Sequence, residues 1–346
     1  MRAAIFHGGR DIRLEELPLP VLRNDDVLIE VRAAGICGSD VHRYRGHDPW
    51  GAGGPPPRRA GHELAGVVSA LGPGASGLAV GQPVAVEPMQ LAYCGFCPEC
   101  SRGDSNLCSQ RGKSVTRRSS AGFSEFDAAA ARHVYPLAPH VSFAVAALTD
   151  VYACAVHALH RVPVAAGKTV AILGTGPVAL ALGQIARREG AKVIMVGRRD
   201  AALSLALRIG SADSVVDGSR EQPAAECADI VFEVVGGTSS DTLMQAVASV
   251  ARGGTVGILG AFVDHMHVPY RESNRKEITF RLCNGYSTWQ GQREFQIALD
   301  LIAEPTLDAA SLITHRFPLE NIALAFETAG DKSRSHAVKV IVEPHA

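Results

Sequence analysis

Residues 168–200, KTVAILGTGPVALALGQIARREGAKVIMVGRRD, decide the fold that we expect for this chain. Thr169–Leu173 is a short apolar run with several β-branched residues, as a buried parallel strand requires. A helical pattern then runs to Glu189 and is ended by Gly190, and residues 192–196 predict a second strand. The stretch therefore predicts a strand, a crossover helix and a parallel strand.

The turn between the first strand and the helix consists of small and apolar residues: Gly174, Thr175, Gly176, Pro177, Val178 and Ala179. Gly174 permits a tight turn, Gly176 lets a pyrophosphate approach the backbone, and Ala179 allows close contact between helix and strand. The helix N-terminus offers free N–H groups and a positive dipole end to phosphates. In this setting the pattern predicts a dinucleotide site.

Length and composition limit the remaining possibilities. The 346 residues suffice for two domains, and the chain is 47% hydrophobic and 20% charged with a formal net charge of −1. This balance gives no reason to expect a nucleic-acid or membrane partner. Polar residues interrupt the N-terminus from His7 onward, so no signal peptide is predicted, and residues 143–159 are too polar and short for a membrane span. Eight cysteines then favour metal ligands or reduced thiols in a cytoplasmic protein.

Four cysteines form a C-x₂-C-x₂-C-x₇-C array, at Cys94, Cys97, Cys100 and Cys108. Thiolates at this spacing match a closed tetrahedral zinc site, which is structural because no position is left for water or substrate. Iron–sulfur ligation shares the first three positions but continues with a shorter step and a proline, so zinc is favoured. A DNA-binding zinc finger would need a basic helix or a basic excess, and the sequence provides neither.

The first third of the chain is β-rich, with strands predicted at residues 27–32, 63–70 and 83–87. Cys37 and His62 lie at the ends of such strands and could form part of a zinc site with an open position, as catalysis requires. Each of them alone is more typical of a packed core. Asp150 interrupts an apolar helix predicted over 143–159, where an unpaired carboxylate is costly to bury. A hydrogen-bonded residue at a helix start is the alternative.

The second half alternates helices and strands. Helices are predicted at 201–209, 241–252 and 292–304, and further strands at 214–216, 229–235, 255–259 and 278–282. Together with the two strands above they make six parallel strands with crossover helices, which is a doubly wound sheet. A last strand at 337–342 can return to the N-terminal β region, so the dinucleotide domain is expected to be inserted into the first domain.

These motifs together resemble the zinc-dependent medium-chain alcohol and polyol dehydrogenases over essentially the whole chain. Gly61-His62-Glu63 followed by Gly66 and Gly72 is similar to the zinc signature of that family. The resemblance implies an α/β protein with a β-rich GroES-like catalytic domain, residues 1–150 and 287–346. It also implies a doubly wound parallel-sheet Rossmann domain, residues 151–286, and assembly into a homodimer or homotetramer.

The resemblance also implies roles for particular residues. Cys37 and His62 match catalytic zinc ligands, with Asp40 orienting His62. Ser39 and His42 match members of the family's proton relay. Glu63 matches a carboxylate behind the ligands that can also act as an alternative ligand, and we place it in the catalytic group. Lys339, in the last predicted strand, is assigned to the cofactor-binding group.

The third protein ligand of the catalytic zinc is predicted to be Asp150. By resemblance, this aspartate matches the bacterial secondary-alcohol group of the family. Residues 153–157 look instead like the polyol group, which usually has Glu-Pro where this chain has Asp150-Val151. Cys154, one helical turn further on, and Glu63 are the other candidates.

The expected cofactor is NADP(H) in preference to NAD(H). NAD enzymes of this fold place an acidic residue at the end of the second strand to bind the ribose 2′-OH. Gly197 stands there in this chain, followed by Arg198 and Arg199, whose guanidinium groups can bind a 2′-phosphate. The alternative is two solvated arginines, with NAD bound by Asp200 or by backbone groups.

The predicted reaction is hydride transfer between NAD(P) and a secondary alcohol or polyol and its ketone. Zinc polarises the alcohol oxygen, and the proton leaves through Ser39 and His42. Tyr44, Arg45, His47 and Asp48 are polar and fit either a multi-hydroxyl substrate or a surface position. The alternatives are an NAD-preferring sorbitol- or threonine-type dehydrogenase and a non-catalytic zinc-binding relative.

Overall fold

A computed structural model of the chain describes residues 1–46, 56–88, 93–110, 121–263 and 265–346. The chain forms two compact units. Unit 1 contains Met1–Asp150 together with Ser287–Ala346, and unit 2 contains Val151–Tyr286. The chain therefore enters unit 2 once and leaves it once, and unit 1 is completed by the C-terminal segment.

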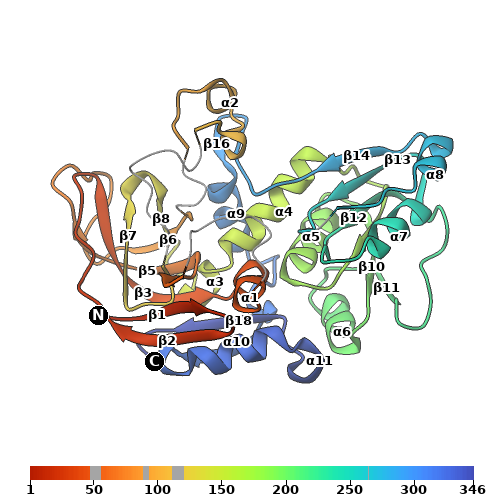
Figure 1. The fold of residues 1–346 in the computed structure, drawn as a ribbon. Helices are drawn as coiled ribbons and strands as arrows, with labels where there is room; N and C mark the ends of the chain where they lie inside the picture. Colours follow the sequence, from red (N-terminus) through yellow and green to blue (C-terminus); the bar gives the residue numbers. More distant parts are fainter. Residues whose placement is uncertain (47–55, 89–92, 111–120, 264) are drawn as a thin grey trace. The chain divides into compact units, whose positions relative to one another are not determined.

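Unit 2 is built on a six-stranded parallel sheet, drawn in green to blue in Figure 1. In spatial order its strands are β11 (Ser214–Asp217), β10 (Lys192–Gly197), β9 (Thr169–Leu173), β12 (Ala228–Glu233), β13 (Val250–Ile258) and β14 (Thr279–Leu282). Its helices include α5 (Pro177–Arg188), α6 (Asp200–Arg208), α7 (Asp241–Ser249) and α8 (Tyr270–Lys276). The strand order reverses between β9 and β12. In such sheets ligands bind outside the carboxyl ends of the strands at this switch point.

Unit 1 is built on β-structure that is mainly antiparallel, with one parallel pair of strands in its larger sheet. A seven-stranded sheet contains β17 (Ile313–Pro318), β18 (Lys339–Glu343), β3 (Asp26–Gly35), β5 (Glu63–Leu71), β6 (Pro83–Val86) and β8 (Val134–Pro136), with β7 (Phe126–Ala130) paired to β3. A second sheet contains β1 (Arg2–Gly8), β2 (Asp11–Glu16) and β4 (Arg58–Arg59). The C-terminal strand β18 pairs with β3 near Gly35, so the end of the chain lies beside the segment that leads to Cys37.

The helices of unit 1 lie around these sheets and in a separate lobe (Figure 1). They include α1 (Gly38–Tyr44), α2 (Pro98–Ser101), α3 (Phe143–Ala146), α9 (Glu294–Ile302), α10 (Ile322–Gly330) and α11 (Lys332–Ser335). Helix α4 (Thr149–Arg161) begins in unit 1 and continues into unit 2. The core of unit 1 joins residues far apart in sequence, including Ile29, Leu64, Phe123 and Phe326.

Three helix predictions were wrong in extent. The helix predicted over 292–304 is α9 and is shorter at both ends; at its start, residues 292–293 pair as a strand with residues 288–289. The helix predicted over 241–252 ends at Ser249, because Val250 is extended and pairs with Ala228 of β12. Strand pairing thus overrides the Gly253-Gly254 stop signal. The helix predicted over 143–159 is divided into α3 and α4, since a tight turn intervenes in which Leu148 N–H bonds to Val145 O at 2.9 Å.

The segment Phe143–Arg161 is long and apolar enough to cross a membrane by length and composition alone. In the structure 67% of its most apolar window is buried inside the protein. That burial is typical of a core helix.

Candidate metal centres and dinucleotide site

The pairing of β3 with β5 brings together the first group of candidate metal ligands. Gly35 of β3 lies opposite Glu63 of β5, so Cys37, just after β3, comes close to His62, just before β5. Ligand atoms of Cys37, His62 and Glu63 all lie within 4.8 Å of one another. A thiolate, an imidazole and a carboxylate are the donor types of catalytic zinc sites, so these residues fit the predicted metal.

Asp40 faces the imidazole of His62 from the first turn of α1. The distance from His62 Nδ1 to Asp40 Oδ1 is 3.4 Å, so the carboxylate faces Nδ1, which leaves Nε2 for a metal. Burial by itself would lower the pKa of His62, but the charges of Asp40 and Cys37 outweigh it and raise that pKa well above its usual value. Arg43 Nη1 lies 3.7 Å from Asp40 Oδ1, and Cys37 N–H donates to the other carboxylate oxygen at 3.0 Å.

Glu63 forms a buried ion pair with Lys339 of β18, and both side chains are 1% exposed. Burial by itself would lower the pKa of Lys339, but the charges of Glu63, Cys37 and Asp150 help to raise it. Lys339 therefore lies in unit 1 beside the candidate metal ligands, and the other cofactor candidates lie in unit 2. Its assignment to cofactor binding stays a prediction.

Asp150 is not part of the group of three ligand atoms that the structure brings together. It is half-buried in the first turn of α4 and is the last residue of the first segment of unit 1. Its charge acts on Lys339, which places it in the same electrostatic environment as Glu63. Cys154 follows one turn later, within unit 2. The choice among these three residues stays a prediction.

The two relay candidates lie on α1, directly after Cys37. Ser39 and His42 are three positions apart and therefore share a helix face, and both are half-buried. Tyr44, at the end of the same helix, is only 7% exposed, and its ring centroid lies 5.1 Å from that of Phe326. Tyr44 is thus a core residue, and Arg45 donates to Gly330 O. The other two substrate-pocket candidates, His47 and Asp48, lie outside the described residues.

The four-cysteine lobe has the geometry of a closed metal site. The Sγ–Sγ distances are 3.9 Å between Cys94 and Cys100, 3.8 Å between Cys97 and Cys108, and 3.6 Å between Cys94 and Cys108. Four sulfurs bound to one zinc at about 2.3 Å lie about 3.8 Å apart. Burial opposes ionisation of Cys94, but the backbone N–H groups of Phe96 and Cys97 help to lower its pKa to about 6. The thiol set therefore fits zinc.

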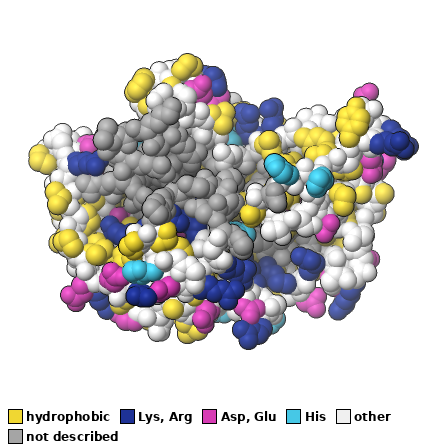
Figure 2. All heavy atoms as spheres, in the orientation of Figure 1, with side chains coloured by type: hydrophobic (Ala, Val, Ile, Leu, Met, Phe, Trp, Pro, Cys, Tyr) yellow, Lys and Arg dark blue, Asp and Glu magenta, His cyan; other side chains and the backbone are white. Residues whose placement is uncertain are grey.

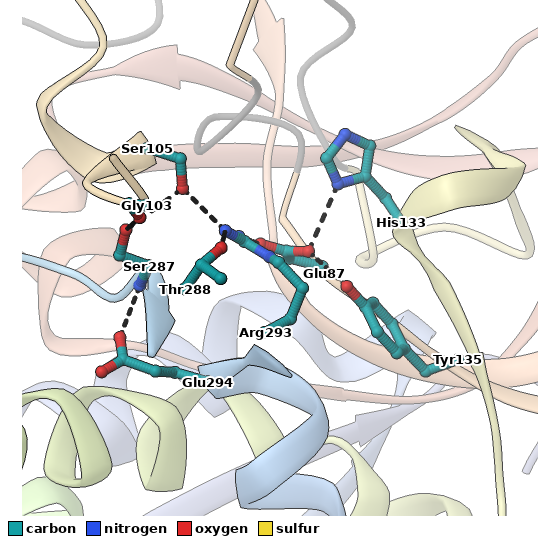
Figure 3. A network of polar contacts seen from close by, with 9 residues as sticks. All are labelled: Glu87, Gly103, Ser105, His133, Tyr135, Ser287, Thr288, Arg293 and Glu294. Carbon is teal, nitrogen blue, oxygen red and sulfur yellow. Dashed lines mark hydrogen bonds and ion pairs between the residues drawn. The ribbon is translucent and has the colours of Figure 1, made fainter. Parts of the chain in front are cut away.

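Arg293 joins this lobe to the main sheet of unit 1 (Figure 3). Its Nη1 donates to Ser105 Oγ at 2.6 Å and to Thr288 Oγ1 at 3.1 Å, and its Nη2 is ion paired with Glu87. Ser105 lies in the lobe, between its third and fourth cysteines. Because Thr288 lies just after the chain leaves unit 2, this arginine holds three separate parts of the chain together.

Two further sets of contacts surround this arginine (Figure 3). Glu87, which is fully buried, accepts a hydrogen bond from Tyr135 Oη at 2.8 Å and lies 3.4 Å from His133 Nδ1. Burial raises the pKa of Glu87, but His133 and Arg293 outweigh this effect and lower it. On the lobe side, the Ser287 hydroxyl donates to Gly103 O.

Arg293→Met is expected to destabilise unit 1 by about 3 kcal/mol, because it leaves the Glu87 carboxylate buried without its cation. It is also expected to speed zinc release from the lobe. Thermal unfolding and a colorimetric chelator measure these two effects. Arg316→Met is the control, since the ion pair of Arg316 with Glu343 is 50% and 28% exposed. The control is expected to change stability by less than about 1 kcal/mol. Equal behaviour of the two variants would contradict the anchoring role.

The glycine-rich turn of unit 2 has the shape that a dinucleotide needs. Gly174 adopts φ 126°, which favours glycine, and its N–H bonds to Val196 O at 2.8 Å. Gly176 is the N-cap of α5, followed by Pro177. A Cβ at Gly176 would meet no atom within 4 Å, so the backbone there is open to a ligand. Ala179 is fully buried, as close packing requires. The turn therefore fits the phosphates of a dinucleotide.

The end of β10 lies beside this turn. Gly197 is its last residue, and Arg198, which follows, is exposed. Arg199 is half-buried, and its Nη2 donates to Thr175 O at 3.3 Å and to Thr175 Oγ1 at 3.4 Å. The structure thus places one of the two candidate phosphate-binding arginines against the glycine-rich turn.

The sequence did not single out three of these contacts. Arg43 carries a local signal, because it stands three positions after Asp40 on one helix. Arg293 carries none, because it is 206 residues from its partner Glu87. Thr175 stood inside the motif, but its contact with Arg199 depends on the pairing of β9 with β10.

Comparison with known proteins gives consistent matches. A family model described as Alcohol dehydrogenase GroES-like domain matches residues 23–139, and one described as Zinc-binding dehydrogenase matches residues 177–304. Sorbitol dehydrogenase of Bacillus subtilis (strain 168) is 31% identical over 360 residues, which cover 100% of this chain and 98% of that protein. L-threonine 3-dehydrogenase of the same organism is 32% identical over 332 residues, which cover 91% of this chain and 90% of that protein.

A solved structure from Sinorhizobium meliloti 1021, described as a zinc-binding dehydrogenase bound to NADP, has a TM-score of 0.86 and 27% identity. The match covers 99% of both chains. These findings confirm the predicted fold class, and with the ligand sets above they support zinc and a nicotinamide cofactor. The chain belongs to the zinc-dependent medium-chain alcohol and polyol dehydrogenases, oxidoreductases that combine a GroES-like domain with a Rossmann domain.

Proposed function

We propose that this protein is an NADP(H)-preferring dehydrogenase that interconverts a secondary alcohol or polyol and its ketone. The group of Cys37, His62 and their carboxylate neighbours carries this proposal, because it brings together the donor types of a catalytic zinc site. A bound zinc polarises the alcohol oxygen and lowers its pKa, and the nicotinamide accepts the hydride. Within the chain, Asp40 fixes the tautomer of His62, while Ser39 Oγ takes the proton and passes it towards His42.

The third protein ligand in this proposal is Asp150. Glu63 lies nearer to Cys37 and His62, but Lys339 already pairs with it. The charge of Asp150 also helps to raise the pKa of Lys339, which supports a place for this carboxylate near the same site. A second zinc, held by the four-cysteine lobe, has a structural role and brings the content to two ions per chain.

The proposed preference for NADP(H) depends on the end of β10. Position 197 is a glycine, so it offers no acidic side chain to a ribose 2′-OH. The guanidinium groups of Arg198 and Arg199 follow directly. The similar structure that was determined with NADP supports this assignment.

Titration of the zinc-loaded protein with NADPH and NADH, followed by cofactor fluorescence, tests the preference for NADP(H). We expect at least about tenfold tighter binding of NADPH, as a charge-assisted hydrogen bond to the 2′-phosphate provides. Equal or tighter binding of NADH would overturn the preference.

The substrate class is tested with a panel of secondary alcohols, polyols and L-threonine, assayed by the absorbance of the reduced nicotinamide. Sorbitol and threonine enter because dehydrogenases for them are among the similar proteins. Turnover of a secondary alcohol or polyol with NADP supports the proposal. An NAD-dependent polyol activity would favour the sorbitol-type alternative. No turnover of any panel member by fully zinc-loaded protein would favour a non-catalytic relative.

We also propose that the protein is cytoplasmic and forms a homodimer or homotetramer. Strand β14 is an edge strand of the unit 2 sheet, and Leu282 on it is 66% exposed. Tyr270 on α8, the helix before β14, is 76% exposed, and Figure 2 shows hydrophobic side chains over this end of unit 2. An uncovered edge with apolar side chains fits pairing with a second copy.

A further inference from the structure

Gly197 and Thr175 lie against each other at the carboxyl edge of the unit 2 sheet. Strands β9 and β10 pair in parallel, so the turn after Leu173 lies beside the end of β10. A Cβ placed on Gly197 would lie 2.4 Å from Thr175 Cγ2 and 3.1 Å from Thr175 Oγ1. Leu203 Cδ2 would lie at 3.1 Å. Thr175 therefore fills the space that any side chain at position 197 needs.

Thr175 cannot clear this space by rotating about χ1. Both of its γ atoms lie on the side of Gly197, within 3.1 Å of the added Cβ. A β-branched side chain fills two of the three staggered positions in every rotamer, so at least one γ atom always remains on that side. Thr175 is 5% exposed, and its hydroxyl accepts from Arg199 at 3.4 Å, so rotation would also break that contact.

We propose that Thr175 is a specificity-determining residue for the cofactor. Its γ atoms exclude an acidic side chain from position 197, and its carbonyl and hydroxyl oxygens hold the guanidinium of Arg199 beside the glycine-rich turn. This inference rests on the proposed preference for NADP(H). It adds Thr175 to the two arginines that are proposed to bind the 2′-phosphate. Because Thr175 and Gly197 touch, their substitutions should act on the cofactor non-additively.

The test is a double-mutant cycle on the zinc-loaded protein, made of wild type, Thr175→Ala, Gly197→Asp and the double variant. Dissociation constants for NADH and NADPH are read from cofactor fluorescence. Gly197→Asp alone is expected to weaken NADPH and to leave NADH no tighter than in wild type. The same change in the Thr175→Ala background is expected to tighten NADH at least about tenfold, because the carboxylate can then reach the ribose 2′-OH.

A second cycle tests the steric claim, that Thr175 fills the space beside position 197, even if Gly197→Asp fails to fold. Gly197→Ala adds only the Cβ and is expected to lower the unfolding temperature by about 5 °C, as overpacking does. In the Thr175→Ala background most of this loss should disappear. Thr255→Ala on β13 is the matched control, and its effect should add to that of Gly197→Ala, since the residues share no contact in the described chain.

Additive effects in both cycles would overturn the inference, since Thr175 would then have no influence on what position 197 accepts. If wild type binds NADH more tightly than NADPH, the proposed preference fails. The cycles still report in that case whether Thr175 excludes an acid from position 197. The two failures are thus distinguishable.

Discussion

Cys37→Ala is expected to lower turnover by about three orders of magnitude or more, because it removes a proposed ligand of the catalytic zinc and with it the transition-state stabilisation that this metal would supply. Its zinc content should fall from two ions per chain to one, since the four-cysteine lobe is unchanged. Initial rates with the best alcohol of the panel and elemental analysis of the same preparation measure both effects.

Cys97→Ala is the matched comparison. It removes one thiolate of the closed lobe, so one zinc should again be lost, but here the unfolding temperature should fall while the folded fraction keeps its turnover. Two metal ions with unequal roles require these opposite outcomes. One tightly bound zinc in fully loaded wild type, or turnover retained by Cys37→Ala, would show that the assignment of the two sites is incorrect.

Asp150→Asn is expected to reduce zinc occupancy and turnover together, by about a hundredfold or more in turnover, since an amide is a poor zinc ligand. Cys154→Ala, one turn along the same helix, should affect packing only. Zinc content and turnover are measured on the same samples. These two variants separate a metal ligand from a neighbouring side chain of the helix.

Glu63→Gln distinguishes the remaining candidate ligand. This change leaves Lys339, which is 1% exposed, without its carboxylate, so unfolding should become easier by about 3 kcal/mol while zinc is retained. The double variant Glu63→Gln with Lys339→Met should recover much of that stability, because it removes both charges. If Glu63→Gln loses zinc while Asp150→Asn keeps zinc and near-normal turnover, Glu63 is the third ligand.

Local sequence signals predicted unit 2 well. Thr169–Leu173 was expected as a strand and is β9, because a short β-branched run between turn residues specifies a buried strand without help from distant residues. The boundary between α7 and β13 was misplaced because pairing with β12 extends the strand back to Val250. Long-range pairing, which the sequence pattern does not record, decided that boundary.

The candidate sites also differ in whether a local sequence signal predicts them. The spacing of four cysteines within 15 residues is a local signal, and their sulfur atoms lie together in the structure. Cys37 and His62 are brought together by an antiparallel strand pair, so only a resemblance could connect them beforehand. The pairing of Glu63 with Lys339 spans 276 residues and follows from the addition of β18 to the sheet. Contacts of this kind depend on topology and leave no local pattern.

The addition of β18 has a consequence for how the protein is made. Unit 2 is one continuous segment, so a ribosome completes it before it has synthesised the strand that finishes unit 1. The strand that carries Lys339 is synthesised after all of unit 2, and until then β3 lacks its β18 neighbour next to Cys37. The nascent chain therefore holds a finished nucleotide-binding unit while its catalytic unit is still incomplete. We expect metal to enter the Cys37 site only after β18 has paired with β3, and to enter the four-cysteine lobe earlier.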